Sequence, residues 1–494
     1  MKLRPLVLFE IAALLGWLVC VAVVWIRPGE AALVPLDASA LATGPSSERW
    51  YGIYLQDQHI GFSVSRATPT AGGGMLYEQR SQLRMLTFGK VQEVITVGAA
   101  LTDPSARLSR FDFFLAGDAV RLAVQGEHRG EELVMRVDQA GELQELRFPM
   151  ESPPQVGLSM EAVLARTALA PGVVVRVPYF DPVTLQQGER ELRVTDVEVL
   201  ETGDEAWWLT SSFAGVETRA LVSVTGETLR EENAMGMSMV RMAPEAARAV
   251  PTQDAPADLI ALTSVPLDGA LPGDSRSLQT LTLRIAGVPP ERVRHEPPLQ
   301  TRDGERVTVT VPAWDTLPAD PGAADPAPPP DTLAPTVTLP SAHPEVQAVL
   351  PTALGGAVTR KGRVAALVRW VFDNVEKVPS IGVPNGLSVL RAREGDCNEH
   401  TALFVTLARA AGIPARIAAG VVFSDRITDK GAFYYHAWPE VFLGGAAGWV
   451  PVDPTFGQVV ADATHIKLVE GDLDRQVEIM GVMGRLRFVA DGAR

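Results

Sequence analysis

Hydrophobic and polar residues follow three different patterns along this chain. Residues 6–26 are almost wholly apolar, and roughly 20 such residues suffice to cross the hydrocarbon core of a membrane. Between residues 50 and 242, short segments of alternating polarity are separated by turn signals, which predicts an antiparallel sheet with one face toward water. From Val364 to Val375, apolar residues recur at intervals of three and four, which predicts a helix.

The first pattern predicts an N-terminal transmembrane helix that anchors the chain through residues 1–28. Lys2 and Arg4 precede the apolar run and Arg27 alone follows it directly, so the excess of positive charge places the N-terminus in the cytoplasm. The rest of the chain is then expected on the periplasmic, extracytoplasmic side of the inner membrane as a single-pass protein. A cleaved signal peptide is the competing interpretation, but the small residues at 38–40 lie far beyond the apolar run.

The second pattern extends over residues 46–245, for which we predict a β-rich antiparallel domain. Residues 50–55 and 59–64 read as its first hairpin, and residues 158–168 as its one helix. The region contains no evident nucleophile, metal cluster or glycine-rich phosphate loop. We therefore expect it to act as a spacer or a binding domain.

Three further parts follow this region. We predict a small β domain at residues 256–314. Residues 315–342 are rich in proline, and this composition predicts an extended linker. Residues 343–494 carry two helical patterns followed by β-prone runs, an order that is typical of an α+β domain in which a helix packs on a sheet. The whole chain is thus expected to be multidomain.

The last of these parts has a helix-start signal around a cysteine. Asp396 is placed to cap a helix, Glu399 can complete a capping box, and Gly412 followed by Pro414 supplies the stop. Cys397 is then the first helical residue, where unpaired backbone N–H groups and the helix dipole favour a thiolate. Such a thiol suits a nucleophile, although a small buried hydrophobe is the alternative interpretation of a single cysteine.

A thiolate nucleophile needs a base and a third group that orients the base, and both follow in order. His436 lies in a β-prone run rich in aromatic residues, at 433–441. Asp453 comes near the end of a second β-prone run, at 448–455, so that its side chain is expected to project from a strand end. These spacings leave room for a strand or two and allow the three side chains to meet across a sheet.

At these residues the last third of the chain resembles the transglutaminase-like superfamily, the papain-related group that includes transglutaminases and microbial cysteine peptidases. The resemblance rests on four ordered blocks, namely Gly395-Asp396-Cys397, Ala410-Ala411-Gly412-Ile413-Pro414-Ala415-Arg416, His436-Ala437-Trp438-Pro439-Glu440-Val441 and Gly448-Trp449-Val450-Pro451-Val452-Asp453-Pro454. It implies a papain-like α+β domain with a catalytic triad, in which Cys397 is the nucleophile, His436 the base and Asp453 the group that orients the base.

The chain departs from the family after the cysteine. Transglutaminases of animals follow the catalytic cysteine with tryptophan and need calcium, whereas Asn398 follows Cys397 here and no acidic loop has the spacing of a calcium site. We expect no cofactor and no metal. Cys397, His400, His436 and Asp453 could also ligate zinc, but the tight Cys-x-x-Cys and His-Glu-x-x-His spacings of zinc proteins are missing.

Other residues near the predicted site leave part of the mechanism open. The backbone N–H of Cys397 is one expected donor to an oxyanion, and Asn385, Tyr434 and Trp438 are the alternatives for a second. His465 is expected to have a structural role.

The composition and net charge restrict the kinds of partner that this chain can bind. The formal net charge of −15 and the pI near 5.1 argue against a nucleic-acid surface, which would have to neutralise phosphates. The 2 cysteines, Cys20 and Cys397, exclude a framework of structural disulfides. The sequence sets no oligomeric state.

Two functions from different classes fit these observations. The first is a membrane-anchored thiol enzyme that forms a Cys397 thioester from a peptide or glutamine amide, then transfers the acyl group to water or an amine. It would be a cysteine peptidase, an amidase or a transglutaminase, with a protein or cell-wall peptide as substrate and the membrane contacted through residues 6–26. The alternative is a non-catalytic binding or scaffold protein of the cell envelope that retains the fold.

Overall fold

The computed structural model describes residues 43–490 apart from a set of short gaps, namely 88–89, 118–120, 140–141, 183–185, 214–215, 234–235, 252–263, 272–273, 379–382, 428–430, 447 and 472. The predicted anchor at residues 1–28 lies outside the described residues and stays a prediction. Within the described part of the chain, every helix is too short or too polar to span a membrane.

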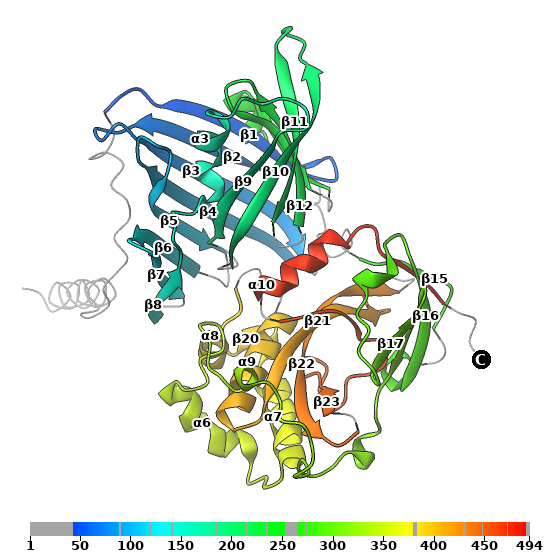
Figure 1. Cartoon of the computed structure of the whole chain (residues 1–494). Helices are drawn as coiled ribbons and strands as arrows, with labels where there is room; N and C mark the ends of the chain where they lie inside the picture. The colour runs from blue at the N-terminus through cyan, green and yellow to red at the C-terminus, as the bar shows by residue number, and fades with distance from the viewer. Residues whose placement is uncertain are drawn as a thin grey trace, which may run out of the picture.

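A large antiparallel sheet occupies the first half of the described chain, as the alternating pattern predicted (Figure 1). The sheet has 14 strands among the described residues, in the order β8-β7-β6-β5-β4-β3-β2-β1-β14-β13-β12-β11-β10-β9. Their bounds are β1 (Ser47–Leu55), β2 (Gln58–Pro69), β3 (Met75–Thr87), β4 (Lys90–Thr102), β5 (Leu108–Ala116), β6 (Arg121–Arg129), β7 (Glu132–Gln139), β8 (Glu142–Pro149), β9 (Val174–Asp181), β10 (Gln186–Val199), β11 (Glu205–Phe213), β12 (Val216–Ser223), β13 (Thr228–Asn233) and β14 (Met237–Met242).

Of the local predictions for this region, the first hairpin is confirmed and the helix is corrected. The first hairpin is confirmed, because β1 pairs with β2 across a turn at Gln56 and Asp57. The helix expected at 158–168 is shorter, since only η1 (Gly157–Ser159) and α3 (Met160–Leu164) are helical. A further short helix, α4 (Pro244–Arg248), follows the last strand of the sheet.

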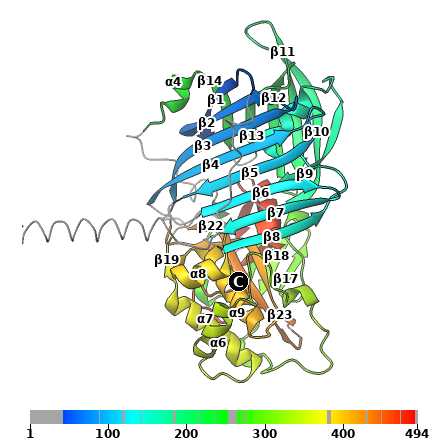
Figure 2. The same ribbon diagram turned by 90° about the vertical axis from the view of Figure 1, so that its left-hand side faces the viewer.

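The large sheet curls so that its two edge strands, β8 and β9, approach each other, and the rings of Phe148 and Phe180 on these strands lie 5.8 Å apart between centroids (Figures 1 and 2). Met160 and Leu164 of α3 pack into an apolar cluster with residues of β9 to β12. A cavity of about 290 Å³ lies on this concave side, lined by both arms of the sheet and by α3. The β-rich region therefore has an interior of its own.

A smaller sheet has the strand order β15-β25-β16-β18-β17. Its strands are β15 (Leu267–Asp268), β16 (Thr280–Ala286), β17 (Gln300–Asp303), β18 (Arg306–Thr310) and β25 (Arg487–Ala490), with η2 (Ser275–Ser277) and η3 (Pro290–Arg292) between them. Strand β25 comes from the end of the chain and lies between β15 and β16. The small β domain is thus completed by a segment that sequence order separates from it.

The C-terminal part has the expected α+β layout, with helices on one face of a four-stranded antiparallel sheet of order β23-β22-β21-β24. Its elements are α6 (Pro344–Leu354), α7 (Arg360–Asn374), α8 (Gly386–Ala392), α9 (Cys397–Ala410), β21 (Ala415–Ser424), β22 (Ala432–Gly444), β23 (Gly448–Pro451), β24 (Ile466–Glu470), α10 (Leu473–Gln476) and η6 (Val477–Gly481), together with the short pair β19 (Glu376–Lys377) and β20 (Glu394–Gly395). The predicted apolar face of α7 is confirmed, because its residues Val364, Leu367, Val368 and Val371 are buried in the helical core.

The proline-rich segment at 315–342 lies against this part of the chain, where the sequence suggested an extended spacer. It contains η5 (Pro330–Thr332), and η4 (Trp314–Thr316) begins just before it. Leu317 and Leu339 are buried in the same core as α7 and α9. Apolar residues among the prolines therefore fasten the segment to the domain.

The opposite face of the four-stranded sheet packs on the small sheet through a shared apolar core, to which Phe423, Phe433 and Phe488 contribute. A buried charge cluster adds to this contact. Lys467 lies 2.6 Å from Glu296 of the small domain and 2.7 Å from Glu440 of β22. The two units are therefore held together by apolar and ionic contacts.

The large sheet touches the C-terminal part at two places. Val383 is buried among apolar residues of the β-rich region, and η6 contacts β12. Helix α10 lies between the two parts in the view of Figure 1. Residues next to the cysteine-bearing helix are thus close to the large sheet.

Candidate active site

Cys397 is the first residue of α9, as the capping signals predicted. Asp396 caps the helix and accepts a hydrogen bond from the backbone N–H of Asn398 at 2.8 Å, while Glu399 Oε2 accepts one from the N–H of Asp396 at 3.0 Å. Gly395 has a φ of 151°, and a Cβ there would lie 2.3 Å from Cβ of Glu399. Glycine is therefore required before the cap, which accounts for the Gly-Asp-Cys sequence.

The start of α9 lies against β22. Thr401 Oγ1 donates to the backbone carbonyl of Ala437 at 3.0 Å, and the backbone N–H of Ala437 acts to lower the pKa of the Cys397 thiol. Ala437 directly follows His436. The structure therefore joins the helix that begins at Cys397 to the strand at the residue directly after His436.

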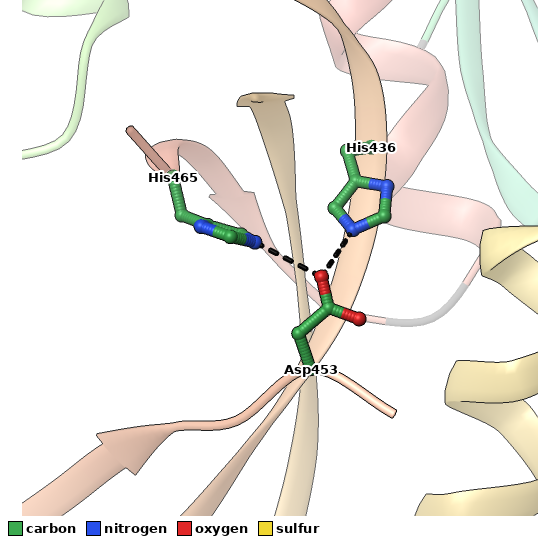
Figure 3. Close-up of side chains that lie close together, drawn as sticks. All are labelled: His436, Asp453 and His465. Atoms are coloured by element: carbon green, nitrogen blue, oxygen red, sulfur yellow. Dashed lines mark hydrogen bonds and ion pairs between the residues drawn. The ribbon is translucent and has the colours of Figure 1, made fainter. Parts of the chain in front are cut away.

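His436 and Asp453 form a buried hydrogen-bonded pair, shown in Figure 3. Nε2 of His436 lies 2.8 Å from Oδ2 of Asp453. The ring of Phe456 stacks on the imidazole, with centroids 4.9 Å apart and an angle of 6° between planes. Asp453 and Phe456 together fix the orientation of the ring. Because Nε2 is bonded to Asp453, Nδ1 is the nitrogen that can accept or donate a proton in a reaction.

The Asp453 carboxylate is saturated with donors. Oδ1 accepts the backbone N–H groups of Thr455 at 2.7 Å and Phe456 at 3.0 Å, while Oδ2 faces His436 and His465. Burial alone would raise the pKa of Asp453, but the two histidines hold it well below its usual range. Asp453 is therefore ionised, which is the state needed to orient an imidazole.

His465 also belongs to this cluster, a role that sequence analysis missed. It lies in the loop before β24, and its Nε2 is 3.0 Å from Oδ2 of Asp453. Its Nδ1 is 3.0 Å from the backbone carbonyl of Asp462. No local motif marks this histidine, because the contact depends on how the loop between β23 and β24 returns to the sheet.

The small β domain reaches the back of the cluster through Arg276. Its guanidinium lies 3.1 Å from Oδ2 of Asp462 and 4.3 Å above the ring centroid of Phe456. Arg276 also donates to the backbone carbonyl of Phe423 at 2.7 Å. The stack formed by Arg276, Phe456 and His436 therefore joins two parts of the chain behind the His436 imidazole.

The protonation state at rest differs from the expected thiolate. Burial raises the pKa of Cys397 well above its ordinary value, and the charges of Asp396, Glu399 and Asp453 raise it further, while the Ala437 N–H acts in the opposite sense. Burial lowers the pKa of His436. Burial and three carboxylates thus favour a neutral thiol at Cys397 over the thiolate, and burial favours a neutral imidazole at His436.

The suggested second oxyanion donors have other environments. Asn385 caps α8, where its Oδ1 accepts from Leu387 and Ser388 and its Nδ2 donates to Val337. Tyr434 and Trp438 are buried, and the indole of Trp438 packs edge-on to His465 with centroids 5.1 Å apart. Asn385 is thus occupied as a helix cap.

Tyr435 lies nearer to the thiol. Its hydroxyl is 2.8 Å from Oδ1 of Asn398 and 2.8 Å from Oε1 of Gln476 in α10. Both partners are amide oxygens, which accept, and a phenol has one proton, so the hydroxyl donates to one of the two oxygens at a time. Burial raises the pKa of Tyr435 and the Cys397 thiolate raises it further, which keeps the phenol protonated next to the sulfur.

The zinc alternative has no support in the geometry. His400 uses Nδ1 in a 2.7 Å contact to the backbone carbonyl of Asp396. In the described part of the chain, the grouping of possible ligand atoms near the site consists of His436, Asp453 and His465 and includes neither Cys397 nor His400. Those three side chains bond directly to one another at 2.8 and 3.0 Å, which accounts for their polar atoms without an ion.

A second acidic grouping, of Glu296, Glu440 and Glu470, also contains two cations. Lys467 contacts all three carboxylates, and so does Arg416. Their positive charges occupy the positions in which a metal ion would have to bind. This grouping is therefore an ion-pair cluster.

Together, a cysteine at the start of a buried helix, a histidine on the adjoining strand and an aspartate behind it define the papain-like class of thiol sites. Comparison with known families agrees with this class: residues 348–454 match the sequence model of the transglutaminase-like superfamily. The resemblance expected for the C-terminal third is thereby confirmed, and it ends one residue after Asp453.

Searches among known proteins add structural likenesses. No curated protein matches the chain. A candidate cysteine protease from Cytophaga hutchinsonii is 19% identical with a TM-score of 0.28, over 40% of this chain and 79% of its own. A β-barrel-like protein of a domain of unknown function from Brucella abortus is 13% identical with a TM-score of 0.32, over 41% and 96%. A candidate protease from Parabacteroides distasonis is 12% identical with a TM-score of 0.18, over 78% and 70%.

Proposed function

We propose that this chain is a thiol enzyme that forms an acyl-enzyme thioester on Cys397 from a peptide or glutamine amide. The observation that carries the proposal is geometric: Cys397 begins α9, this helix bonds through Thr401 to Ala437, and the preceding His436 has its Nε2 bonded to Asp453. The family match over residues 348–454 supports it.

The reaction begins with a proton transfer. As the sulfur of Cys397 attacks the carbonyl carbon, Nδ1 of His436 accepts the thiol proton, and Asp453 stabilises the imidazolium through the 2.8 Å bond to Nε2. The imidazolium then donates the proton to the leaving nitrogen as the carbon–nitrogen bond breaks. Ammonia leaves from a glutamine side chain, and an amine leaves from a peptide bond.

The oxyanion of the tetrahedral intermediate needs nearby donors. The backbone N–H of Cys397 at the start of α9 is one. Sequence analysis left Asn385, Tyr434 and Trp438 as alternatives for the second. We propose instead the hydroxyl of Tyr435, which would turn its proton from an amide oxygen of Asn398 or Gln476 to the oxyanion. Both donors lie on the side of the site that the helix start and β22 share.

Deacylation ends the cycle by one of two routes. Water attacks the thioester in a peptidase or amidase, whereas a primary amine attacks it in a transglutaminase, and His436 accepts the proton of the attacking group in both. We propose a protein or cell-wall peptide as substrate. This follows from the predicted anchor at residues 6–26, which would hold the site on the extracytoplasmic face of the inner membrane.

The test is product analysis by mass spectrometry after the full chain is mixed with glutamine-containing peptides, with and without a fluorescent primary amine. Deamidation, backbone cleavage and amine incorporation each identify one route. Cys397→Ser is the control for the nucleophile, and His128→Gln is the matched control for a histidine substitution in the distant β6. If no Cys397-dependent product forms from a broad peptide library, the proposed enzymatic function is contradicted.

The alternative is a non-catalytic binding protein of the cell envelope. The observation in its favour is the cavity of about 290 Å³ within the large sheet, which is separate from Cys397. Such a protein has no need of a histidine that activates the thiol. The reactivity of Cys397 therefore separates the two functions.

A further inference from the structure

His465 is a fully enclosed histidine whose two ring nitrogens both face oxygen acceptors. Nε2 lies 3.0 Å from Oδ2 of Asp453, and Nδ1 lies 3.0 Å from the carbonyl oxygen of Asp462 and 3.4 Å from its Oδ1 (Figure 3 shows the Asp453 contact). The side chain of His465 is 2% exposed. Water therefore contributes little to the solvation of this ring.

A neutral imidazole carries one N–H and one lone pair. In this site the lone pair would point at a carboxylate or a carbonyl oxygen, because among the residues that the structure describes only oxygen atoms face the two nitrogens. Both nitrogens are satisfied only when both carry protons. The geometry therefore requires an imidazolium between Asp453 and Asp462.

The surroundings complete the charge balance. Asp453 and Asp462 provide two negative charges, and Arg276 neutralises part of the second from its other side, 3.1 Å from Oδ2. The rings of Trp438 and Phe456 lie edge-on to His465, with centroids 5.1 and 6.2 Å away. His436 is the remaining titratable group, with its ring centroid 5.5 Å away.

We propose that His465 is a positioning residue that stays doubly protonated through the reaction and holds the Asp453 carboxylate against His436. The inference rests on the proposed function for its catalytic meaning. Asp453 gives the same oxygen, Oδ2, to both histidines. A permanent cation on one side thus fixes the carboxylate and offsets its charge, so that His436 begins the reaction neutral and able to accept the thiol proton.

The remaining electrostatics agree with this role. Burial alone would lower the pKa of His465, but its hydrogen bonds to Asp453 and Asp462 raise it to about 9. Burial lowers the pKa of His436, Asp453 acts to raise it, and the charge of His465 lowers it again. His465 neither gains nor loses a proton when Cys397 is deprotonated, because the thiol proton moves only to Nδ1 of His436.

A purely structural role predicts a different behaviour. If His465 only fastened the loop between β23 and β24, its removal would lower stability and leave the pKa of His436 unchanged. If it is the permanent cation, its removal raises the pKa of His436, because a positive charge about 5.5 Å away is lost. At that separation we expect a rise of about one to two pH units.

The experiment is a pH titration by NMR of the full chain with ¹⁵N-labelled histidine, which has 7 such residues to assign. In the unaltered protein we expect both nitrogens of His465 to be protonated from pH 5 to 8, while His436 is neutral at pH 7. In His465→Gln we expect the His436 titration to move to higher pH. His128→Gln, in β6, is the control and is expected to leave it in place.

Two results overturn the inference. One is a singly protonated His465 at pH 7 in the unaltered protein, a measurement that does not depend on how the variant folds. The other is a folded His465→Gln protein in which His436 titrates as before. Neither result depends on turnover. A chain with no Cys397-dependent product but with the expected titrations would contradict the proposed function and leave the protonation of His465 established.

Discussion

Thr401 of α9 donates a hydrogen bond to the backbone carbonyl of Ala437 at 3.0 Å. This contact joins the helix that Cys397 begins to the strand position directly after His436, so that the proposed nucleophile and the proposed base are placed by one helix-to-strand contact. The residues around them decide how well that pair works. The following predictions concern those residues.

Asp453→Asn is expected to lower turnover by a factor of about 10² to 10⁴, because an amide can hold His436 in the wrong tautomer. It also leaves the His465 cation with one carboxylate fewer, so the melting temperature should fall. Steady-state kinetics and thermal unfolding measure the two effects. Asp303→Asn, at the exposed end of β17, is the control, and equal turnover in both variants would contradict the orienting role.

Phe456→Leu is expected to lower turnover about tenfold with a smaller effect on folding, because the stacked ring holds the plane of His436 at 4.9 Å. Turnover is to be compared at matched folded fraction. Phe442→Leu removes a ring that contacts Trp449 and is the matched control. Unchanged kinetics in Phe456→Leu would show that Asp453 alone fixes the imidazole.

Lys467→Met is expected to destabilise the chain by about 3 kcal/mol or more, because it leaves buried carboxylates with one cation fewer. The Lys467 side chain is 4% exposed and contacts Glu296, Glu440 and Glu470. Urea unfolding at pH 7 gives the change in free energy. Arg391→Met breaks the exposed pair with Glu345, for which we expect ~1 kcal/mol or less; similar losses in both variants would refute a structural role for the buried cluster.

The pKa of His465 also sets a dependence of stability on pH. The folded-state value of about 9 lies above the ordinary value near 6.5, so the folded chain binds the extra proton. This stabilisation is complete below about pH 6.5 and is lost as pH rises through 9, with a span of up to ~3 kcal/mol.

Unfolding free energies between pH 6.5 and 9.5 measure this effect as the difference between the unaltered protein and His465→Gln. The comparison removes the contribution of Cys397, whose raised pKa acts in the same direction at high pH. We expect the difference to shrink as pH rises. A constant difference would mean that His465 is neutral in the folded chain.

Local signals sufficed for the cysteine-bearing helix. Asp396, Glu399 and Gly412 mark the two ends of α9 within a few residues of the observed bounds, because capping depends on neighbouring residues. The order of His436 and Asp453 in β-prone runs, read with the family resemblance, predicted residues that the structure brings together. The catalytic roles of the three remain predictions.

Long-range contacts explain what the sequence did not reveal. His465 meets Asp453 only because a loop folds back, and β25 completes a sheet whose other strands lie far earlier in the chain. The thiolate expected at Cys397 is disfavoured for the same reason, since burial and the Asp453 charge, both of which raise the pKa of the thiol, come from tertiary structure. The capping of α9 could be predicted from residues that are neighbours in the sequence, whereas the burial of the Cys397 thiol could not.

The central claim is that His436 activates Cys397, and the rate at which iodoacetamide alkylates Cys397 tests it without a known substrate. Peptide mass spectrometry locates the label on Cys397 and separates it from Cys20. At pH 7 we expect the unaltered chain to react at least about tenfold faster than His436→Ala, with His128→Ala unchanged. Equal rates in the unaltered chain and in His436→Ala would contradict an activated thiol and favour the binding protein.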